Sequence, residues 1–312
     1  MDGPGTMLAG KYQLVDIAGT GGMATVWRAV QRGPAAFERF VAVKLIHARL
    51  AHDPAFVAMF VEEARVSAQL VHPNIVQVYD FGQGEDRYFL VMEWVDGMSL
   101  SQFLRLGSEH GVRIPWPFVA MLGLDTLRGL QAAHERKDAR GRVSPIFHRD
   151  VTPQNILLGT NGIVKLADFG LARATDRARM TAPDIVKGKV GYLAPELTKV
   201  PEATTQSDLY SLGIVLWQAL AGRTLFEGQD DIEIFAAASR GETPPIRALR
   251  DDVPDELANV IERALAFDPK DRFESAHQMA RVLIRALRSL NCDPDPRLVT
   301  EPLRELRQLG SR

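Results

Sequence analysis

Apolar and polar residues follow two different patterns along the chain, and the pattern changes near residue 95. Before this point, short runs of β-branched and aromatic residues are separated by glycines and polar turns, which is typical of strands. One helix is also predicted, over residues 54–70, since Asp53 before it has the chemistry of an N-cap. Phe56, Phe60 and Leu70 recur at helical spacing along one side of this helix. The predicted strands cover residues 12–17, 24–30, 40–46, 75–81 and 87–93.

Beyond Gly97 the apolar spacing becomes helical, with glycine or proline breaks between most of the predicted helices. We therefore expect an α+β fold with two lobes: a small β-rich N-terminal lobe with one main helix, and a larger, mainly helical C-terminal lobe. The predicted helices cover residues 117–135, 206–221, 230–239, 254–266 and 275–287. The expected boundaries are 1–10 for an N-terminal extension, 11–95 for the N-terminal lobe, 93–97 for a hinge, 98–288 for the C-terminal lobe and 289–312 for a short, peripheral C-terminal tail.

Composition narrows the class of protein without naming a function. With 312 residues, 46% of them hydrophobic, the chain can bury a substantial core. The formal net charge of -2 supplies no basic field for a phosphate backbone, so we expect no nucleic-acid partner. Cys292 is the single cysteine, which excludes an intrachain disulfide and a zinc site built from cysteines. The longest apolar stretch, residues 212–221, is too short to cross a bilayer, and the N-terminus has no signal-peptide pattern, so we expect a cytoplasmic protein without a membrane partner.

Two features of the first half carry candidate chemistry. The stretch GTGGMATV, residues 19–26, lies between two predicted strands, where glycines let backbone N–H groups approach phosphates closely. A glycine-rich hairpin turn without a ligand is the alternative interpretation. In FVAVKLI, residues 40–46, strand alternation places Ala42 and Lys44 on one face. A lysine beside a small residue on an interior face requires an anion, whereas the usual alternative is a solvated surface lysine.

The helix at 54–70 offers two carboxylates to Lys44, Glu62 and Glu63. Glu63 lies seven residues, or two turns, from both Phe56 and Leu70, so it shares their inward side. Glu62 points in another direction. The helix phase therefore predicts Glu63 as the partner.

The second half contains FHRDVTPQNILL, residues 147–158, and LADFGLAR, residues 166–173. The first stretch holds Asp150 and, five residues later, Asn155. The second places Asp168 after a predicted strand and before a glycine. Together these three side chains supply a base and hard oxygen ligands, which suits Mg²⁺ bound to nucleotide phosphates.

With these motifs in order, the chain resembles a eukaryotic-like protein kinase of the bacterial Ser/Thr type over about residues 11–288. The ordered set consists of the glycine loop, VAVK, a helix glutamate, HRD with Asn155, DFG, and APE at residues 194–196. GGM in the glycine loop and HPNIV at residues 72–76 look most like bacterial members. The resemblance also implies that Asp208 anchors the catalytic loop and that Arg272 pairs with Glu196.

The resemblance implies an ATP-dependent protein serine/threonine kinase with autophosphorylation, using Mg²⁺, with Mn²⁺ as the alternative ion. Lys44, held by Glu63, would contact the α- and β-phosphates. Asn155 and Asp168 would bind the metal, and Asp150 would accept or orient the substrate hydroxyl. Met92 would be the gatekeeper residue, while His148 would organise the site. The implied ATP-binding residues are Ile17, Ala18, Gly19, Thr20, Gly21, Gly22, Met23, Ala24, Thr25, Val26, Ala42, Lys44, Met92, Glu93, Val95 and Leu157.

Four positions depart from the family pattern. The third loop glycine is Ala24, and Gln154 replaces an acid that often selects basic substrates. Thr152 stands where the family has a lysine that reaches the γ-phosphate, and Lys189 stands where it has a threonine near the catalytic aspartate. We interpret the last two as one exchange, in which the Lys189 ammonium approaches the γ-phosphate from the opposite wall. The alternative is that Thr152 weakens or abolishes catalysis.

Regulation and two competing functions complete the sequence-based hypotheses. Arg149 beside Asp150 resembles the branch in which a phosphorylated activation segment docks on that arginine. Thr181 is the expected acceptor, with Asp184 as a partial phosphate mimic.

The competing functions are a nucleotide-binding pseudokinase that acts as a scaffold, favoured by Thr152, and a small-molecule kinase, disfavoured by the APE segment. The protein substrate and the oligomeric state are not predicted. A basic stretch over residues 135–145 is interpreted as a solvated loop.

Overall fold

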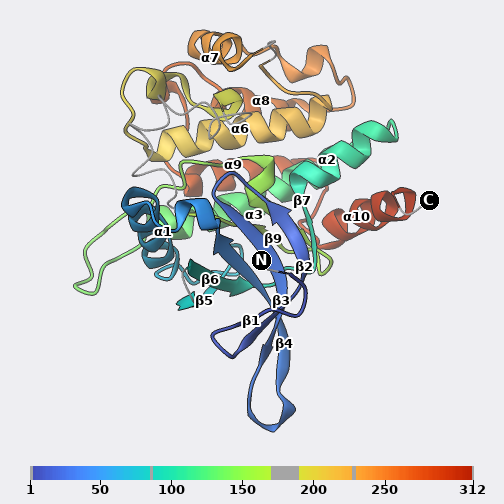
Figure 1. The fold of residues 1–312 in the computed structure, drawn as a ribbon. Helices are drawn as coiled ribbons and strands as arrows, with labels where there is room; N and C mark the ends of the chain where they lie inside the picture. The colour runs from blue at the N-terminus through green and yellow to red at the C-terminus, as the bar shows by residue number, and fades with distance from the viewer. Residues whose placement is uncertain (1–2, 85–86, 170–189, 227–229, 311–312) are drawn as a thin grey trace. The chain divides into compact units, whose positions relative to one another are not determined.

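The computed structural model describes residues 3–84, 87–169, 190–226 and 230–310 (Figure 1). The described residues divide into two compact units. The first consists of residues 3–71 and 76–95, and the second of residues 72–75, 96–169 and 190–310. The prediction of an α+β fold, with a β-rich first part and a helical second part, is confirmed.

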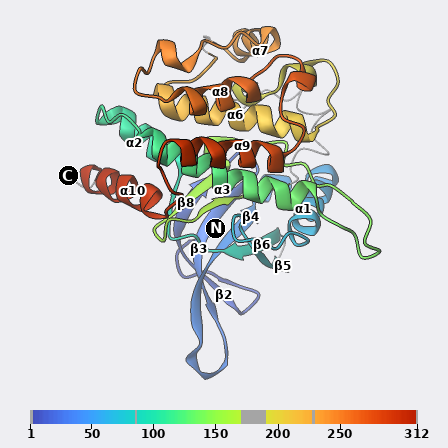
Figure 2. The same ribbon diagram turned by 180° about the vertical axis from the view of Figure 1, so that it is seen from behind.

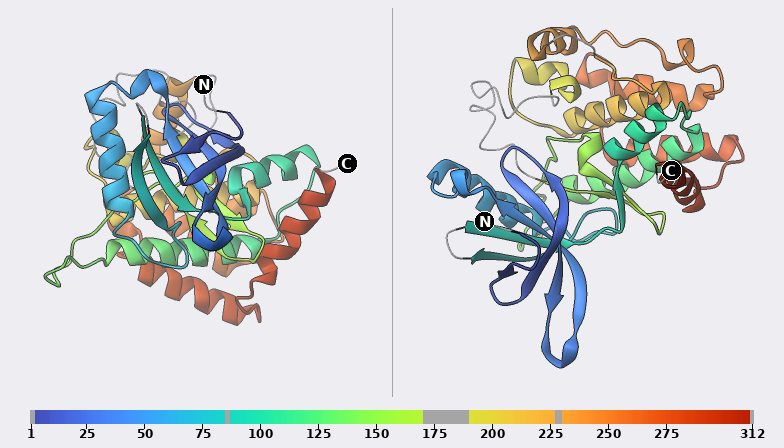
Figure 3. Two further views of the ribbon diagram at one scale, coloured as in Figure 1. Left: turned by 60° about the horizontal axis from the view of Figure 1, so that its bottom comes forward. Right: turned by 45° about the vertical axis from the view of Figure 1, so that its right-hand side comes forward.

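The first unit is built on an antiparallel sheet of six strands in the order β1-β2-β3-β4-β6-β5 (Figure 1). The β3–β4 hairpin extends beyond the other strands of this sheet (Figure 3). Val41 and Val43 pack in a buried cluster with Trp27 and Phe89, on the face of the sheet opposite to the one predicted for Ala42 and Lys44. The strands are β1 Met7–Leu8, β2 Tyr12–Thr20, β3 Ala24–Arg32, β4 Glu38–Ile46, β5 Val78–Gly84 and β6 Arg87–Glu93. Two 3-10 turns accompany them, Pro34–Ala36 and Ala48–Leu50.

One helix, α1 Pro54–Ser67, belongs to the first unit. Asp53 caps it as predicted, since its carboxylate accepts the N–H of Ala55 at 2.9 Å. The helix ends three residues before the predicted Leu70. Its inner side is formed by Met59, Phe60, Glu63, Ala64 and Ser67, which are all buried.

Two predictions for this unit, one of a strand and one of the N-terminal extension, need correction. The predicted strand at 75–81 is β5, Val78–Gly84. It begins later, since Ile75 belongs to the second unit, where it forms an isolated parallel bridge with Leu166. Met7 and Leu8, interpreted as part of an extension, form β1 and pair with Gln13 and Tyr12.

The second unit contains a helical core and a small antiparallel sheet in the order β7-β8-β9. Helix α3 packs against both α6 and α9, and α8 packs against the same two helices. The strands are β7 Gly97–Ser99, β8 Ile156–Gly159 and β9 Val164–Leu166. The helices are α2 Leu100–Glu109, α3 Trp116–His134, α6 Thr205–Ala221, α7 Asp231–Arg240, α8 Asp255–Ala264, α9 Ala276–Ser289 and α10 Arg297–Leu309. The 3-10 turns are Pro153–Asn155, Val190–Tyr192, Pro195–Thr198, Ile246–Ala248 and Pro269–Asp271.

The C-terminal segment is not peripheral, and that prediction is wrong. Helix α10 buries Val299, Leu303 and Leu306, each at most 2% exposed, against α2, α3 and β8. These residues follow the i, i+4, i+7 spacing of one helix face. Pro302 lies inside the helix and would normally argue against one, which explains why the pattern was missed.

The basic stretch at 135–145 is exposed, as predicted, but it has a defined shape. Lys137 and Val143 form an antiparallel bridge. The Asp138 carboxylate accepts the backbone N–H groups of Arg140 and Arg142 at 2.8 and 3.0 Å. The stretch is therefore a small hairpin that follows α3. Among the described helices, none combines the length and the apolar character that crossing a bilayer requires.

Candidate functional site

The glycine loop is the hairpin turn that joins β2 to β3. Gly21 N–H donates to the Ala24 carbonyl at 3.0 Å, and Thr20 pairs with Thr25 across the turn. The ladder contains a register shift between Ile17 and Gly19. Bulges of this kind twist a strand and are common beside active sites. The stretch is therefore a glycine-rich hairpin turn, which is compatible with both sequence interpretations. Phosphate binding by this turn remains a prediction.

The loop is tied to the end of β4 by residues that sequence reasoning missed. His47 N–H donates to the Met23 carbonyl at 2.9 Å, and the Arg49 guanidinium donates to the Gly22 carbonyl at 3.0 Å. The His47 ring also lies 3.2 Å from the Thr25 hydroxyl. Because no periodicity marks these contacts, only the three-dimensional structure could find them.

Lys44 and Glu63 form a buried ion pair. The Lys44 ammonium lies 2.6 Å from a Glu63 carboxylate oxygen, and the two side chains are 8% and 1% exposed. Glu62 instead pairs with Arg65 at 2.6 Å, where it is 35% exposed. The predicted choice of Glu63 over Glu62 is therefore confirmed, while the roles of Lys44 and Glu63 in catalysis remain predictions. A buried pair of this kind is costly to break, because the remaining charge loses its partner away from water.

Several predicted nucleotide-binding residues share one face of the first unit's sheet. Directly opposed residues lie on the same face, and Lys44 opposes Val26 on β3, whereas Ala42 opposes Met92 on β6. Ala42 and Met92 are each 7% exposed. This face therefore presents an ammonium next to small and apolar side chains, which suits a ligand with an aromatic and an anionic part.

The end of β6 continues into the predicted hinge. Glu93 N–H donates to the Gln77 carbonyl at 2.8 Å, and the Glu93 carboxylate accepts the Gln77 N–H at 3.3 Å. Val95 is half-buried and is the last residue of this segment of the first unit. In the second unit, Leu157 on β8 is half-buried between the fully buried Ile156 and Leu158.

In the second unit, Asp208 on α6 fixes the backbone of the loop at residues 147–155, which is the predicted catalytic loop. Its carboxylate accepts the N–H groups of His148 and Arg149, both at 2.8 Å, and lies 2.8 Å from Nε2 of His134. Burial raises the pKa of Asp208, but the hydrogen bonds with His134 and with the Arg149 N–H help to outweigh burial, and this pKa lies below its ordinary value. A buried carboxylate therefore stays charged and holds the loop.

Asp150 and Asn155 are joined directly. The Asn155 side-chain amide donates to the Asp150 carbonyl at 2.9 Å and to its carboxylate at 2.8 Å. Both residues are nearly buried, at 6% and 7% exposed. Asn155 N–H also donates to the Thr152 carbonyl at 3.0 Å, which closes the turn Pro153–Asn155. The spacing of five residues thus allows the amide to orient the acid.

His148 packs the catalytic loop against the segment that contains Asp168. Its Nε2 lies 3.0 Å from the Ala167 carbonyl, and its ring centroid lies 4.4 Å from that of Phe169. Burial lowers the pKa of His148, so the ring is neutral near pH 7. Asp168 has a φ of 61°, a left-handed conformation that is uncommon for residues other than glycine and occurs at functional sites. Arg149 has a φ of 69°.

Of the two positions in the predicted exchange, the structure describes Thr152 but not Lys189. Thr152 is 1% exposed, and among the described residues its hydroxyl has no hydrogen-bond partner. Lys189, Thr181 and Asp184 lie outside the described residues. The exchange of Thr152 and Lys189, and the regulatory role of Thr181, therefore remain predictions.

Arg272 pairs with Glu196, as the family resemblance implied. Arg272 makes a bidentate pair with the Glu196 carboxylate, at 2.7 and 2.8 Å, and its guanidinium stacks over Tyr210 at 4.5 Å from the ring centroid. The Arg272 side chain is fully buried, whereas the Glu196 side chain is 25% exposed. This pair fixes the end of the APE segment to the helical core.

The donor set of the second unit fits a hard divalent cation. The side-chain nitrogen of Asn155 donates to Asp150, so the side-chain oxygen of Asn155 can face a ligand. Asp168 adds a carboxylate. Within the described ranges, no three acidic, histidine or cysteine side chains gather as a protein-only metal site. The set therefore suits Mg²⁺, which is usually bound by one or two carboxylates together with phosphate and water oxygens.

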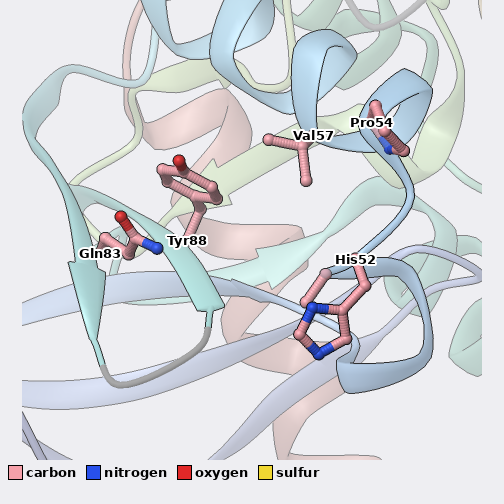
Figure 4. A pocket seen from close by; sticks show the side chains of 6 residues that line it. His52, Pro54, Val57, Gln83 and Tyr88 are labelled. Carbon is pink, nitrogen blue, oxygen red and sulfur yellow. The ribbon is translucent and has the colours of Figure 1, made fainter.

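A separate pocket of about 410 Å³ lies in the first unit between the start of α1 and the ends of β5 and β6 (Figure 4). None of the predicted site residues lines it. Its lining consists of Ala51, His52, Pro54, Val57, Gln83 and Tyr88.

Comparison with known proteins gives one family. A model described as the protein kinase domain matches residues 12–283. The tyrosine-protein kinase MasK of Myxococcus xanthus is 39% identical over 274 residues, which are 88% of this chain and 42% of that protein. The serine/threonine-protein kinase PrkC of Bacillus subtilis is 35% identical over 275 residues, 88% of this chain and 40% of that protein. The chain thus spans less than half the length of both relatives.

A third relative and a solved structure agree with this result. The serine/threonine-protein kinase PknA of Mycobacterium tuberculosis is 36% identical over 303 residues, covering 96% of this chain and 66% of that protein. The crystal structure of the M. tuberculosis PknI kinase domain has a TM-score of 0.66 and 26% identity, and covers 92% of this chain and 99% of that one.

Proposed function

Because this chain belongs to the protein kinase family, we propose that it is an ATP-dependent protein kinase that phosphorylates serine and threonine hydroxyls of proteins, including its own. The observation that carries the proposal is the contact between Asn155 and Asp150, on a loop anchored by Asp208. It gives one buried carboxylate a fixed direction, which a residue that orients an acceptor hydroxyl requires.

Each unit contributes one part of the proposed chemistry. In the first unit, Lys44 binds phosphate oxygens, and Glu63 holds its ammonium in place. The backbone N–H groups of the glycine loop cover the phosphates, and Ala42 and Met92 contact the adenine. These roles are supported by the shared sheet face and by the family match.

In the second unit, Asp150 accepts or orients the proton of the acceptor hydroxyl. Asn155 and Asp168 would hold Mg²⁺, or Mn²⁺, and the bound ion would neutralise charge on the phosphates. Asn155 also keeps the Asp150 carboxylate in position through its amide nitrogen. His148 organises the loop and transfers no proton, since its ring packs on Phe169 and its Nε2 lies beside the Ala167 carbonyl.

Thr152 and Lys189 complete the proposal as an exchanged pair. Thr152 cannot supply the cation that the family places two residues after the catalytic aspartate. We propose that the Lys189 ammonium supplies it, with the Thr152 hydroxyl as a neighbour. The buried Thr152 hydroxyl, without a hydrogen-bond partner among the described residues, supports a site that is completed by another group.

A tyrosine acceptor is the second candidate function, because MasK is named a tyrosine-protein kinase. Pro153 directly after Thr152 favours the serine/threonine branch, as do the names of PrkC and PknA. The pseudokinase alternative is disfavoured by the intact Lys44, Asp150, Asn155 and Asp168.

One experiment separates these candidates. The protein is incubated with Mg-ATP and a generic protein acceptor, and the products are hydrolysed to phosphoamino acids. Phosphoserine and phosphothreonine support the proposal, whereas phosphotyrosine alone supports the second candidate. Nucleotide binding without phosphorylation of the acceptor protein or of the chain itself indicates a pseudokinase.

Regulation by Arg149 and Thr181 is proposed on the same basis. A phosphate on Thr181 would dock on Arg149, whose backbone is already fixed by Asp208. Mass spectrometry of the protein after incubation with Mg-ATP, compared with an Asp150→Asn variant, tests whether Thr181 is modified. We further propose that the domain acts in the cytoplasm, where ATP is present, on a protein partner and without binding nucleic acid or membranes.

A further inference from the structure

Helix α9 carries a row of arginines on its outer face. Arg281, Arg285 and Arg288 are all exposed and follow the i, i+4, i+7 spacing of one helix side. The opposite side of α9, which includes Met279 and Leu283, is buried and packs mainly against α3. Figure 2 shows α9 on the outside of the second unit in that view.

Within the residues that the structure describes, none of the three guanidinium groups makes a hydrogen bond or an ion pair. The helix itself contains no acidic residue in its 14 positions. Helix α10 differs, since it combines three arginines with two glutamates. Like charges at i and i+4 destabilise a helix, so the pair Arg281 and Arg285 opposes folding. Arg288 lies near the helix C-terminus, where a positive charge is favourable.

The geometry of the row selects a linear anionic partner. With a rise of about 1.5 Å per residue, Arg281 and Arg285 are roughly 6 Å apart along the axis, and Arg281 and Arg288 roughly 10.5 Å. Side chains on one side of an extended segment repeat every 6.6 to 6.8 Å, approximately, so alternate acids match the first step. Guanidinium forks bind carboxylate and phosphate oxygens in pairs, which adds direction to charge.

Two other anionic partners fit less well. Membrane binding by a helix requires an apolar face for the lipid, but α9 buries that face in the protein. Nucleic-acid binding requires many phosphate contacts and a positive field, whereas the chain has a net charge of -2 and the row is short.

We propose that the Arg281, Arg285 and Arg288 face of α9 is a docking surface for an acidic segment of a partner protein. The ligand chemistry is a row of carboxylate groups at alternate positions. The surface is separate from the residues assigned to phosphoryl transfer, and its occupation is measured as binding, independently of kinase activity.

The test uses a fluorescein-labelled peptide of twelve residues in which glutamate and serine alternate. Fluorescence anisotropy is measured with the whole chain at low salt, and a peptide with glutamine in place of each glutamate is the ligand control. Arg281→Glu with Arg285→Glu should weaken binding at least about tenfold, because two attractions become repulsions. Arg281→Gln with Arg285→Gln should have a smaller effect in the same direction. Binding should also fall as salt rises.

A matched charge reversal distinguishes docking from general attraction. Arg113 and Arg304 are also exposed but lie outside α9, so Arg113→Glu with Arg304→Glu changes the net charge equally and should leave affinity nearly unchanged. Thermal unfolding confirms that each variant is folded. The proposal is overturned if both reversals weaken binding equally, or if the acidic and glutamine peptides bind alike.

Two further arms identify the source of the anion. A peptide with phosphoserine in place of each glutamate that binds more tightly, with the same dependence on Arg281 and Arg285, overturns the choice of carboxylates in favour of a phosphorylated partner. Binding to vesicles containing phosphatidylserine, without binding to either anionic peptide, overturns the proposal in favour of a membrane.

Discussion

The side-chain amide of Asn155 donates to the carboxylate of Asp150 at 2.8 Å and to its carbonyl at 2.9 Å. One amide therefore fixes both the backbone and the side chain of the acid. Such double support is what a positioning group provides, because a carboxylate that rotates freely would lose the orientation that catalysis needs.

Asp150→Asn should therefore reduce phosphoryl transfer by at least about 100-fold, the lower range for loss of a general base. ATP affinity should change little, because Asp150 is assigned to the acceptor and not to the nucleotide. Single-turnover phosphorylation and equilibrium binding of a fluorescent ATP analogue measure the two quantities separately. Retention of most activity would remove Asp150 from this role.

Glu63→Gln should impair activity far more than Glu62→Gln. Glu63 is 1% exposed and paired with Lys44, whereas Glu62 is 35% exposed and paired with Arg65. The two variants remove the same charge from adjacent positions, so each serves as the control for the other. Comparison of kcat/KM for ATP gives the ranking, and equal losses would contradict the role assigned to the buried pair.

The exchanged pair predicts a coupling between two substitutions. Lys189→Thr alone should lose about 10² to 10³ in kcat, as expected when one electrostatic group at the reacting phosphate is removed. Thr152→Lys alone should also lose activity, because it places a second ammonium in a buried position that is 1% exposed. The double variant should recover much of the loss.

This double-mutant cycle has a clear contrary outcome. Independent positions would give additive losses, and a Lys189→Thr variant with nearly full kcat would show that its charge is not used. Thermal unfolding of the Thr152→Lys variant is needed alongside the kinetics, since a buried lysine also lowers stability.

Acid should destabilise the second unit partly through His148. Burial lowers the pKa of His148 in the folded state from its ordinary 6.5, so the unfolded chain binds a proton first as pH falls. Stability is thus complete above about pH 6.5 and declines below it, down to the lowered pKa. At pH 5.5, one unit below the unfolded pKa, the loss is at most about 1.4 kcal/mol.

The measurement is the free energy of unfolding by urea at pH 7.5 and pH 5.5. A His148→Gln variant, although less stable, should show a smaller fall between the two pH values than the parent protein. The pKa of His72 is also lowered, by burial and by Lys165 and Arg128. Because His72 is present in the parent protein and in the variant, its contribution cancels when the two proteins are compared. An identical fall in the two proteins would mean that His148 does not titrate in this range.

Local patterns predicted the elements better than their limits. The phase of α1 correctly separated Glu63 from Glu62, because seven residues are almost two whole turns. The strand at 75–81 was misplaced because Ile75 pairs with Leu166, a contact between segments far apart in the chain. Helix α2 was absent from the predicted helices, although Ser99 and Gln102 form a capping box at its start.

The site was predicted as a set of motifs, but its connections were not. His134 on α3 lies 2.8 Å from the Asp208 carboxylate, and nothing in the spacing of those residues indicates that contact. The same holds for Arg49 and the Gly22 carbonyl. Side-chain contacts across long sequence separations depend on how the helices and strands pack, which a single sequence does not specify residue by residue.

The anchoring of the catalytic loop by Asp208 has a consequence for deuterium uptake. The N–H groups of His148 and Arg149 belong to a loop, where protons usually exchange with solvent quickly through small local openings. Here both are bonded to a carboxylate that is 1% exposed and part of the buried helix α6. Releasing them exposes a buried charge, so opening the loop requires disruption of the surrounding core. These two protons should therefore exchange as slowly as those in the middle of α6, and Asp208→Asn should accelerate both while leaving the protons of α9 protected.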